Sequence, residues 1–286
     1  MAAGGADRPR GVLAGALGAW AGEARTGGGS AKAAGGGART GEEFSLLPPE
    51  WGNRVVFYQN FNDKDLKPAI NTAKLKVSHG KLPTSDDGLT GRTWSPHKDK
   101  GQARYELQGD LFGGARPYTV MFWWRPTKEM KLESGVNFLT VSGDNGRYIL
   151  NRISGKQEWC QLPSPTITTQ LQNCPGITNI NDVGTRIWYD EPGRWHHVAM
   201  TVYGGSDIKV YYDGAVKNIV TATGRQFKSG EFNRIAIGSI DGDWPADFDE
   251  IILLDRALTD TEIAAYYKSI SGTFATGMFR KNGDGK

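Results

Sequence analysis

The strongest pattern in this chain is an alternation of apolar and polar side chains over residues 193–214, GRWHHVAMTVYGGSDIKVYYDG. The pattern forms two runs joined by a Gly-Gly-Ser-Asp turn. Because the side chains of a strand point alternately to its two faces, a period of two indicates a strand with one face buried. The stretch therefore predicts a β-hairpin.

Two adjacent histidines begin the first strand of this hairpin. The alternation places His196 and His197 on opposite faces, so their imidazoles cannot chelate one metal ion. We expect one ring to pack inside with its nitrogens hydrogen-bonded, and the other to meet solvent or the neighbouring sheet.

Short runs of the same kind continue along the chain from Phe44, separated by turn residues. They predict strands at 54–61, 75–78, 103–108, 118–125, 137–142, 147–153, 185–189, 195–203, 208–212, 216–222, 234–238 and 250–254. Many short strands with turn signals between them are typical of a two-sheet sandwich or jelly roll. The run 118–125 is apolar on both faces, which indicates a central strand covered on both sides. We therefore predict an all-β, two-sheet antiparallel jelly-roll sandwich.

One short helix is predicted near the C-terminal end. Thr259 and Glu262 have the spacing of a capping box, in which two side chains satisfy free backbone amides of the first helical turn. Apolar side chains then recur at helical spacing, at Ile263, Tyr266, Tyr267 and Ile270. We expect the apolar side of this helix to cover one edge of the sandwich.

The two ends of the chain differ in composition from the part rich in strands. Residues 1–43 are mostly Gly and Ala with scattered Arg, and such a segment buries too little apolar surface to fix its backbone. We expect a disordered leader at 1–43, one jelly roll at 44–271 and a flexible tail at 272–286. A weakly apolar run after Arg8 and Arg10 leaves two alternatives for the leader, a targeting peptide or a plain low-complexity segment.

Charge and hydropathy exclude two classes of partner. The formal net charge of the 286 residues is only +3, and Lys and Arg are dispersed rather than clustered as in nucleic-acid-binding proteins. No apolar run approaches the roughly 18 residues that a membrane span requires. We therefore expect neither a nucleic-acid partner nor a transmembrane segment.

The chain has two cysteines, Cys160 and Cys174. The segment between them, QLPSPTITTQLQN, has the composition of a long loop. A disulfide between the two would limit the freedom of this loop in the unfolded chain, worth about 3 kcal/mol, and would require an oxidising compartment. The alternative is two buried or free thiols.

Further segments resemble one known family. YTVMFWWRP reads as an apolar strand with two Trp followed by a basic residue and Pro, RIAIGS as a late strand ending in Gly-Ser, and DFDEIILLDRALTDTEIAAYY as a closing strand and helix. With the hairpin ending in Tyr-Asp-Gly, they resemble the laminin-G-like jelly rolls of the concanavalin A-like lectin/glucanase superfamily. The resemblance covers about residues 51–270. It implies a carbohydrate-binding, adhesion or receptor domain or, in distinct branches, a glycoside hydrolase, and many members bind calcium.

The hydrolase alternative requires two carboxylates that face each other across a sugar. Asp247 and Asp249 would lie on one face of a strand. However, the Glu-x-Asp-x-x-Glu arrangement of the superfamily's retaining glucanases lacks its first position here. Asp249 and Glu250 instead match the Asp-Glu of the non-catalytic jelly rolls, and we expect them to hold loops through hydrogen bonds and an ion pair, for example to Arg256.

The segment SIDGDWPAD, residues 239–247, is the best candidate for binding a ligand. Carboxylates in a turn that contains Gly provide the hard oxygen ligands that calcium prefers, so Asp241, Asp243 and Asp247 are candidate calcium ligands. Trp244 could stack on the apolar face of a sugar, with Asp241 and Asp243 beside it. The alternative is an acidic surface loop with Trp244 folded onto the sandwich.

The sequence thus predicts a non-catalytic module, extracellular or secreted, that binds carbohydrate or glycoprotein, with calcium as its one possible cofactor. A glycoside hydrolase of the same fold and a domain that contacts only proteins are the alternatives.

Overall fold

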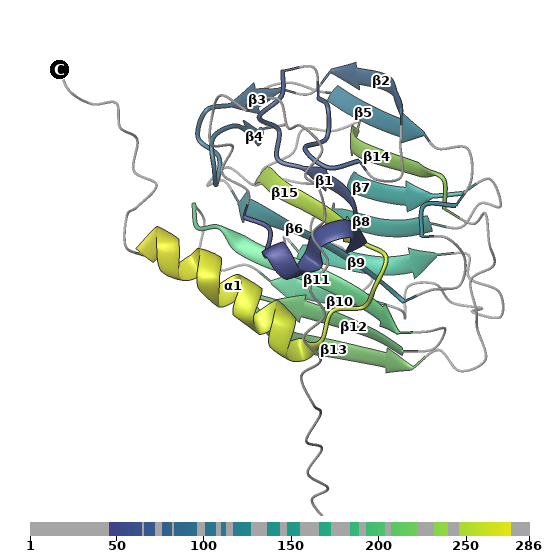
Figure 1. Ribbon diagram of the computed structural model, residues 1–286, viewed down its shortest axis with the longest axis vertical. Helices are drawn as coiled ribbons and strands as arrows, with labels where there is room; N and C mark the ends of the chain where they lie inside the picture. The colour runs from purple at the N-terminus through teal and green to yellow at the C-terminus, as the bar shows by residue number, and fades with distance from the viewer. Residues whose placement is uncertain are drawn as a thin grey trace, which may run out of the picture. The chain divides into compact units, whose positions relative to one another are not determined.

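In the described part of the chain, fifteen strands and one α-helix form an antiparallel β-sandwich (Figure 1). The computed structural model describes residues 46–64, 66–71, 76–81, 83–95, 101–106, 110–112, 117–126, 136–143, 148–154, 166–172, 184–188, 193–203, 207–221, 232–239 and 246–275. All of these belong to one unit, Phe44–Lys286, whereas the expected leader at 1–43 and most of the expected tail lie outside the described residues.

Sheet A contains eight of these strands. Seven follow the order β13 (Ala215–Thr221), β12 (Asp207–Tyr212), β11 (His196–Tyr203), β6 (Tyr118–Pro126), β15 (Ala246–Leu254), β4 (Thr93–Trp94) and β3 (Thr84–Ser85). Strand β1 (Val55–Gln59) pairs with the second half of β15. The predicted hairpin is β11 and β12, and β6 is the predicted central strand, since it pairs with β11 and β15 and is buried along almost its whole length.

Sheet B has seven strands. Their order is β10 (Gly184–Trp188), β9 (Thr166–Gln172), β8 (Tyr148–Ser154), β7 (Val136–Ser142), β14 (Arg234–Ser239), β5 (Gly101–Glu106) and β2 (Lys76–Lys81). Strand β9 corrects one prediction, because it lies within the segment between the two cysteines that we expected to be a loop. Its Thr and Gln are compatible with a strand whose faces carry polar side chains, but with Pro and Asn on either side they read as a loop.

The main core fills the space between the two sheets. Alternate residues of β6 and β11, among them Phe122, Trp124, Val198 and Met200, point into it and are buried. Ile235 and Ile237 of β14 meet them from sheet B. The two-sheet sandwich predicted from the period of two is therefore confirmed.

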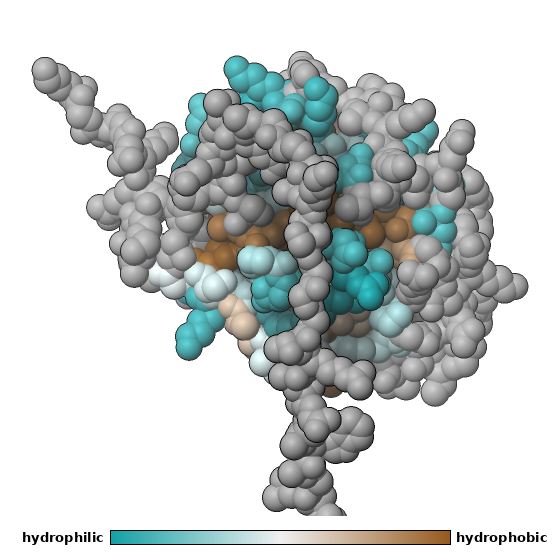
Figure 2. All heavy atoms as spheres, in the orientation of Figure 1, coloured by the Kyte–Doolittle hydropathy of each residue, from teal (hydrophilic) through white to brown (hydrophobic). Residues whose placement is uncertain are grey.

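A second buried layer, here called the outer layer, covers the opposite face of sheet A. Helix α1 (Asp260–Ala275) and the 3-10 helix η1 (Pro49–Arg54) lie on this face (Figure 1). Among the residues that fill it are Trp51, Tyr58, Met121, Trp123, Ala199, Ile263, Tyr266 and Ile270. Figure 2 shows a band of hydrophobic residues across the middle of this face. Strands β1 and β15 are buried at every position. The helix thus covers the face of a sheet rather than an edge of the sandwich, and it continues past residue 271.

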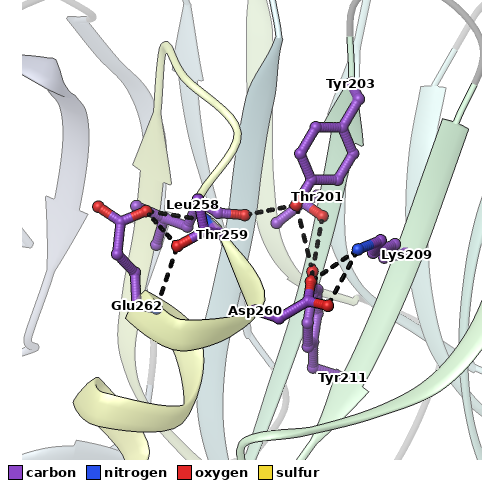
Figure 3. A network of polar contacts seen from close by, with 8 residues as sticks. All are labelled: Thr201, Tyr203, Lys209, Tyr211, Leu258, Thr259, Asp260 and Glu262. Atoms are coloured by element: carbon purple, nitrogen blue, oxygen red, sulfur yellow. Dashed lines mark hydrogen bonds and ion pairs between the residues drawn. The ribbon is translucent and has the colours of Figure 1, made fainter. Parts of the chain in front are cut away.

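Polar contacts hold the start of α1 on the sheet (Figure 3). Lys209 Nζ donates to both carboxylate oxygens of Asp260 at 2.7 and 3.0 Å, and the Tyr211 hydroxyl donates to Asp260 Oδ1 at 2.8 Å. The Tyr203 hydroxyl donates to the backbone oxygen of Leu258 at 2.7 Å. Further along, Tyr267 packs directly on Gly214, where a Cβ would lie 2.9 Å from the tyrosine side chain. These contacts fix the helix over β11 and β12.

The predicted capping box of α1 is confirmed. Thr259 N donates to Glu262 Oε2 at 2.8 Å, and Glu262 N donates to Thr259 Oγ1 at 3.2 Å (Figure 3). Because Thr259→Ala removes the hydroxyl that accepts a helix amide, we expect it to lower the free energy of unfolding by about 1 kcal/mol. Urea unfolding measures this loss. Thr261→Ala, an exposed change two residues later in the same helix, is the matched control, and an equal loss in both variants would contradict a capping role.

No helix in the described part of the chain is long and apolar enough to cross a membrane.

Candidate functional site

Four residues that lie far apart in the sequence meet at one end of sheet A and form what we call the rim cluster: Asp87, Arg125, Trp195 and Asp247. Here β6 ends and β11 and β15 begin, with Arg125 opposite Asp247 in the strand register. Arg125 Nε and Nη2 donate to Asp247 Oδ2 at 3.0 and 2.6 Å. Arg125 Nη2 also donates to the backbone oxygen and to Oδ2 of Asp87, both at 3.0 Å. One guanidinium therefore joins two carboxylates across the rim.

The rim cluster combines an aromatic ring with polar atoms that face solvent. The Arg125 Cζ lies 4.8 Å from the centre of the half-buried Trp195 ring, a cation–π contact that holds both side chains in place. The side chain of Asp87 is 71% exposed, whereas that of Asp247 is 4% exposed. Asp247 thus orients Arg125 from below, and Asp87 and Trp195 present the accessible surface.

Asp87 belongs to the rim loop, residues 86–92, which joins β3 to β4. Leu89 N donates to Asp249 Oδ2 at 2.8 Å, and Thr90 Oγ1 donates to Glu250 Oε1 at 2.8 Å. The loop is therefore held from below by two consecutive carboxylates of β15, here called the acid pair. The expected role of these residues in holding a loop is confirmed, but Arg256 pairs with Glu262 instead, at 2.7 Å.

A β-bulge in β15 explains why two neighbouring carboxylates reach the same loop. Asp249 pairs with Trp123 of β6 and Ile252 pairs with Met121, so β15 has one residue more than β6 between these pairs. An inserted residue interrupts the alternation of faces. Glu250 takes a left-handed backbone conformation with φ of 52°, which is rare for a residue with a side chain. Both carboxylates consequently lie in the outer layer, beneath the rim loop.

Burial changes the acidity of the acid pair. Asp249 and Glu250 are both fully buried. Removal from water disfavours the charged form, and it raises the pKa of Glu250 to about 7 despite hydrogen bonds from the hydroxyls of Tyr58 and Thr90. Burial, followed by repulsion from Glu250, also raises the pKa of Asp249 well above its usual value.

His196 and His197 do lie on opposite faces of β11, but neither meets solvent. His196 Nδ1 lies 2.9 Å from Asp213 Oδ2. His197 is fully buried in the outer layer against Trp123 and Tyr266, with ring centres 5.2 and 5.3 Å apart, and neither ring nitrogen has a hydrogen-bond partner among the described residues. Burial lowers the pKa of His197 to about 3. Meeting solvent, one of the two alternatives expected for the second histidine, is therefore wrong, because α1 covers His197. His196 lies instead on the face of β11 that carries the main core between the sheets, against Trp124 and Tyr212. The expected hydrogen bonds of the buried His197 ring are also wrong among the described residues.

Only one of the predicted site residues lies in the described part of the chain. This residue is Asp247, whose Oδ2 accepts hydrogen bonds from Arg125. Asp241, Asp243 and Trp244 lie outside the described residues, and so do Cys160 and Cys174. Among the described residues, no group of three or more His, Cys, Asp or Glu side chains is placed to hold a metal ion.

Sequence reasoning did not find Asp87, Arg125 or Trp195 as one site. The sequence places Trp195 at the start of one predicted strand, 195–203, and Arg125 at the end of another, 118–125. No local pattern connects residues 87, 125 and 195. They become neighbours only when β11, β6, β15, β4 and β3 have paired in this order in sheet A. A signal that could have been used is the Trp-Arg-Pro at the end of the central strand, where strand ends commonly carry functional residues.

Comparison with known families gives one match. The family described as the concanavalin A-like lectin/glucanases superfamily matches residues 99–264, more than half of the chain. A search of curated protein sequences finds no match.

Solved structures of low sequence identity share the fold. The receptor binding domain of botulinum neurotoxin D aligns with a TM-score of 0.54 at 14% identity, over 77% of this chain and 53% of the toxin domain. The binding domain of botulinum neurotoxin serotype G aligns with a TM-score of 0.54 at 13% identity, over 77% and 52%. This chain therefore matches about half the length of these toxin domains.

A third structure matches over nearly its whole length. It is domain 4 of AbnA, a GH43 extracellular arabinanase from Geobacillus stearothermophilus, in complex with arabinotriose. The TM-score is 0.50 at 17% identity, over 75% of this chain and 98% of that domain. At such identities the three likenesses establish the jelly-roll fold.

Proposed function

This chain belongs to the concanavalin A-like lectin/glucanases superfamily, and from that premise we propose that it is a non-catalytic module that binds carbohydrate or glycoprotein outside the cell. The observation that carries the proposal is the rim cluster, in which a half-buried Trp195, an ordered Arg125 and an exposed Asp87 meet on one surface. A sugar presents both apolar ring faces and hydroxyl groups, so an aromatic ring beside fixed polar atoms suits it.

The structural relatives support a binding role. Two of them are binding domains of toxins, and a third is a domain of an extracellular arabinanase seen with arabinotriose. Residues 240–245, which include Asp241, Asp243 and Trp244, lead directly into β15 at Ala246, opposite Pro126 at the rim. We therefore extend the proposed site from the rim cluster to these three residues.

Calcium remains part of the proposal on the strength of Asp241 and Asp243 alone. Their carboxylates are the hard oxygen ligands that calcium prefers. Asp247 is a weaker candidate than its sequence position indicates, because its Oδ2 already accepts two hydrogen bonds from Arg125.

The geometry favours binding over hydrolysis. A glycosidase needs two carboxyl groups that flank the scissile bond in an open cleft. Asp247 is almost fully buried in an ion pair with Arg125, and Asp249 is fully buried beneath Leu89. These are the two carboxylates that the hydrolase alternative would use.

Binding to an array of immobilised neutral and acidic glycans, with calcium and with a chelator, tests the proposal. We expect wild-type protein to bind at least one glycan class, and Trp195→Ala to weaken that binding about tenfold, since an aromatic side chain at the centre of a site often contributes this much. Ile219→Ala, which changes an exposed apolar residue of β13, is the control and should bind as wild type does.

Two results would count against this function. Wild-type protein that binds no glycan on the array would favour a domain that contacts only proteins. Equal binding by wild type and Trp195→Ala would remove the rim cluster from the site.

A further inference from the structure

We propose that Asp249 and Glu250, which lie beneath the rim and are shielded from any ligand, are positioning residues that hold the rim loop so that Asp87 stands in the binding site. The inference rests on the proposed function for its ligand. It assigns the acid pair a role in affinity beyond its contribution to folding.

The contacts of the rim loop with the acid pair come from the middle of the loop. Leu89 is 1% exposed and sits in the outer layer, where its amide reaches Asp249. Thr90 is the next residue, and its hydroxyl reaches Glu250. Asp87, two residues before Leu89, is the one that contacts Arg125. A shift of Leu89 and Thr90 would therefore be passed along the backbone to Asp87.

The rim loop is closely packed at Gly88, which leaves its backbone little room for another conformation. A Cβ at Gly88 would lie 2.8 Å from Asp249 Oδ2 and 2.7 Å from the backbone oxygen of Arg92. The Gly88 amide donates to the backbone oxygen of Gly91 at 2.9 Å and closes the turn. The carboxylate of Asp249 thus touches the turn that places Asp87.

The far side of the loop is fixed independently of the acid pair. Asn62 Oδ1 accepts the amide of Arg92 at 2.8 Å. Loss of a bond to the acid pair should consequently loosen residues 87–90 while Arg92 and the following strand β4 stay in place. This expected pattern distinguishes positioning of the loop from a general loss of stability.

Thr90 provides a way to test the role without altering the buried acids. Thr90→Val keeps the shape of the side chain but removes the hydroxyl that donates to Glu250, whereas Thr90→Ser keeps the hydroxyl. Asp249→Asn tests the second bond to the loop, the one from Leu89 N. The two carboxylate oxygens of Asp249 accept from Leu89 N and Glu250 N, whereas the asparagine amide has only one acceptor oxygen and cannot keep both bonds.

The experiment measures two quantities for wild type and the three variants. Hydrogen exchange of the Leu89 amide, read by NMR, reports on the loop without any ligand, and the same glycan array reports on affinity. In Thr90→Val and Asp249→Asn we expect Leu89 to exchange at least tenfold faster and glycan binding to weaken five- to tenfold. Thr90→Ser should stay within twofold of wild type in both. The Val198 amide of β11 should keep its protection in every variant, which shows that the fold is intact.

Each of the other outcomes contradicts a specific part of this proposal. Unchanged Leu89 exchange in Thr90→Val and Asp249→Asn, or equal acceleration in Thr90→Ser and Thr90→Val, would show that the acid pair does not hold the loop. Faster exchange with unchanged glycan binding would show that the loop is held but does not position the site. Wild-type protein that binds no glycan overturns the proposed function and the affinity role with it, while Leu89 exchange still decides whether the pair holds the loop.

Discussion

His197→Leu is expected to be more stable at low pH, relative to wild type, than at neutral pH. Wild-type protein should lose about 2 kcal/mol of stability through His197 as the pH falls from 7 to 5, and the leucine variant should not. The imidazole is fully buried among aromatic rings, and burial lowers its pKa from 6.5 to about 3. As the pH falls below 6.5, the unfolded chain binds a proton at His197 and the folded chain does not. The unfolded state is therefore favoured progressively until the pH reaches about 3.

The groups that face His197 provide no counter-charge for a protonated imidazole ring. Tyr266 and Tyr267 of α1 and Trp123 of β6 present rings to it. Asp213, the nearby acid that partly offsets the fall in pKa, uses its carboxylate on the amide of His197 and on the ring of His196. Protonation of His197 in the folded state would thus place an uncompensated charge under the helix.

Urea unfolding at pH 5, 6 and 7 measures the effect. The free energy of unfolding of His197→Leu minus that of wild type should rise by about 2 kcal/mol as the pH falls from 7 to 5. Ile263→Val, which removes one methylene from the same outer layer and carries no titratable group, is the control and should differ from wild type by a constant amount. A constant difference for His197→Leu as well would contradict the assignment.

Glu250→Gln is expected to have the opposite dependence on pH. Burial raises the pKa of Glu250 from 4.5 to about 7, so the folded protein holds a proton that the unfolded chain has already released. The stability that this proton contributes is present below 4.5 and is lost as the pH rises through 7. Glutamine is neutral at every pH and keeps an oxygen to accept from Thr90. Relative to wild type, the variant should therefore gain about 2 kcal/mol between pH 5 and pH 7.

The same unfolding series tests this prediction, with Glu262→Gln as the matched control. Glu262 lies at the start of α1, where a hydrogen bond from Thr259 and its pair with Arg256 hold its pKa below the usual value despite partial burial. Its charge does not change between pH 5 and 7, so the cost of Glu262→Gln should be the same at each pH. A pH-dependent gain that is equal in both variants would show that Glu250 is not its source.

The two effects oppose each other over the same range of pH. Lowering the pH from 7 to 5 destabilises the folded protein through His197 and stabilises it through Glu250, by similar amounts. The double variant His197→Leu/Glu250→Gln should therefore have nearly the same dependence of stability on pH between 5 and 7 as wild type, whereas each single variant should differ from it.

The architecture was readable from sequence because burial in a sandwich repeats every second residue. The hairpin of β11 and β12, the central strand β6 and the capping box of α1 were all identified by patterns of a few neighbouring residues. Strand β9 was missed because its polar residues lack that contrast. The family followed from the same local segments, since their order along the chain is part of the resemblance.

Local patterns could not reveal the bulge at Asp249 and Glu250, because an extra residue is recognised only against the partner strand β6. They could not reveal the burial of His197 either, since α1, which covers it, follows more than sixty residues later in the chain. The rim cluster depends on strand order in the same way, as Asp87, Arg125 and Trp195 become neighbours only in the assembled sheet. The period of the apolar residues therefore specified which faces are apolar. Long-range strand pairing and packing specified which polar groups meet and which of them are exposed to water.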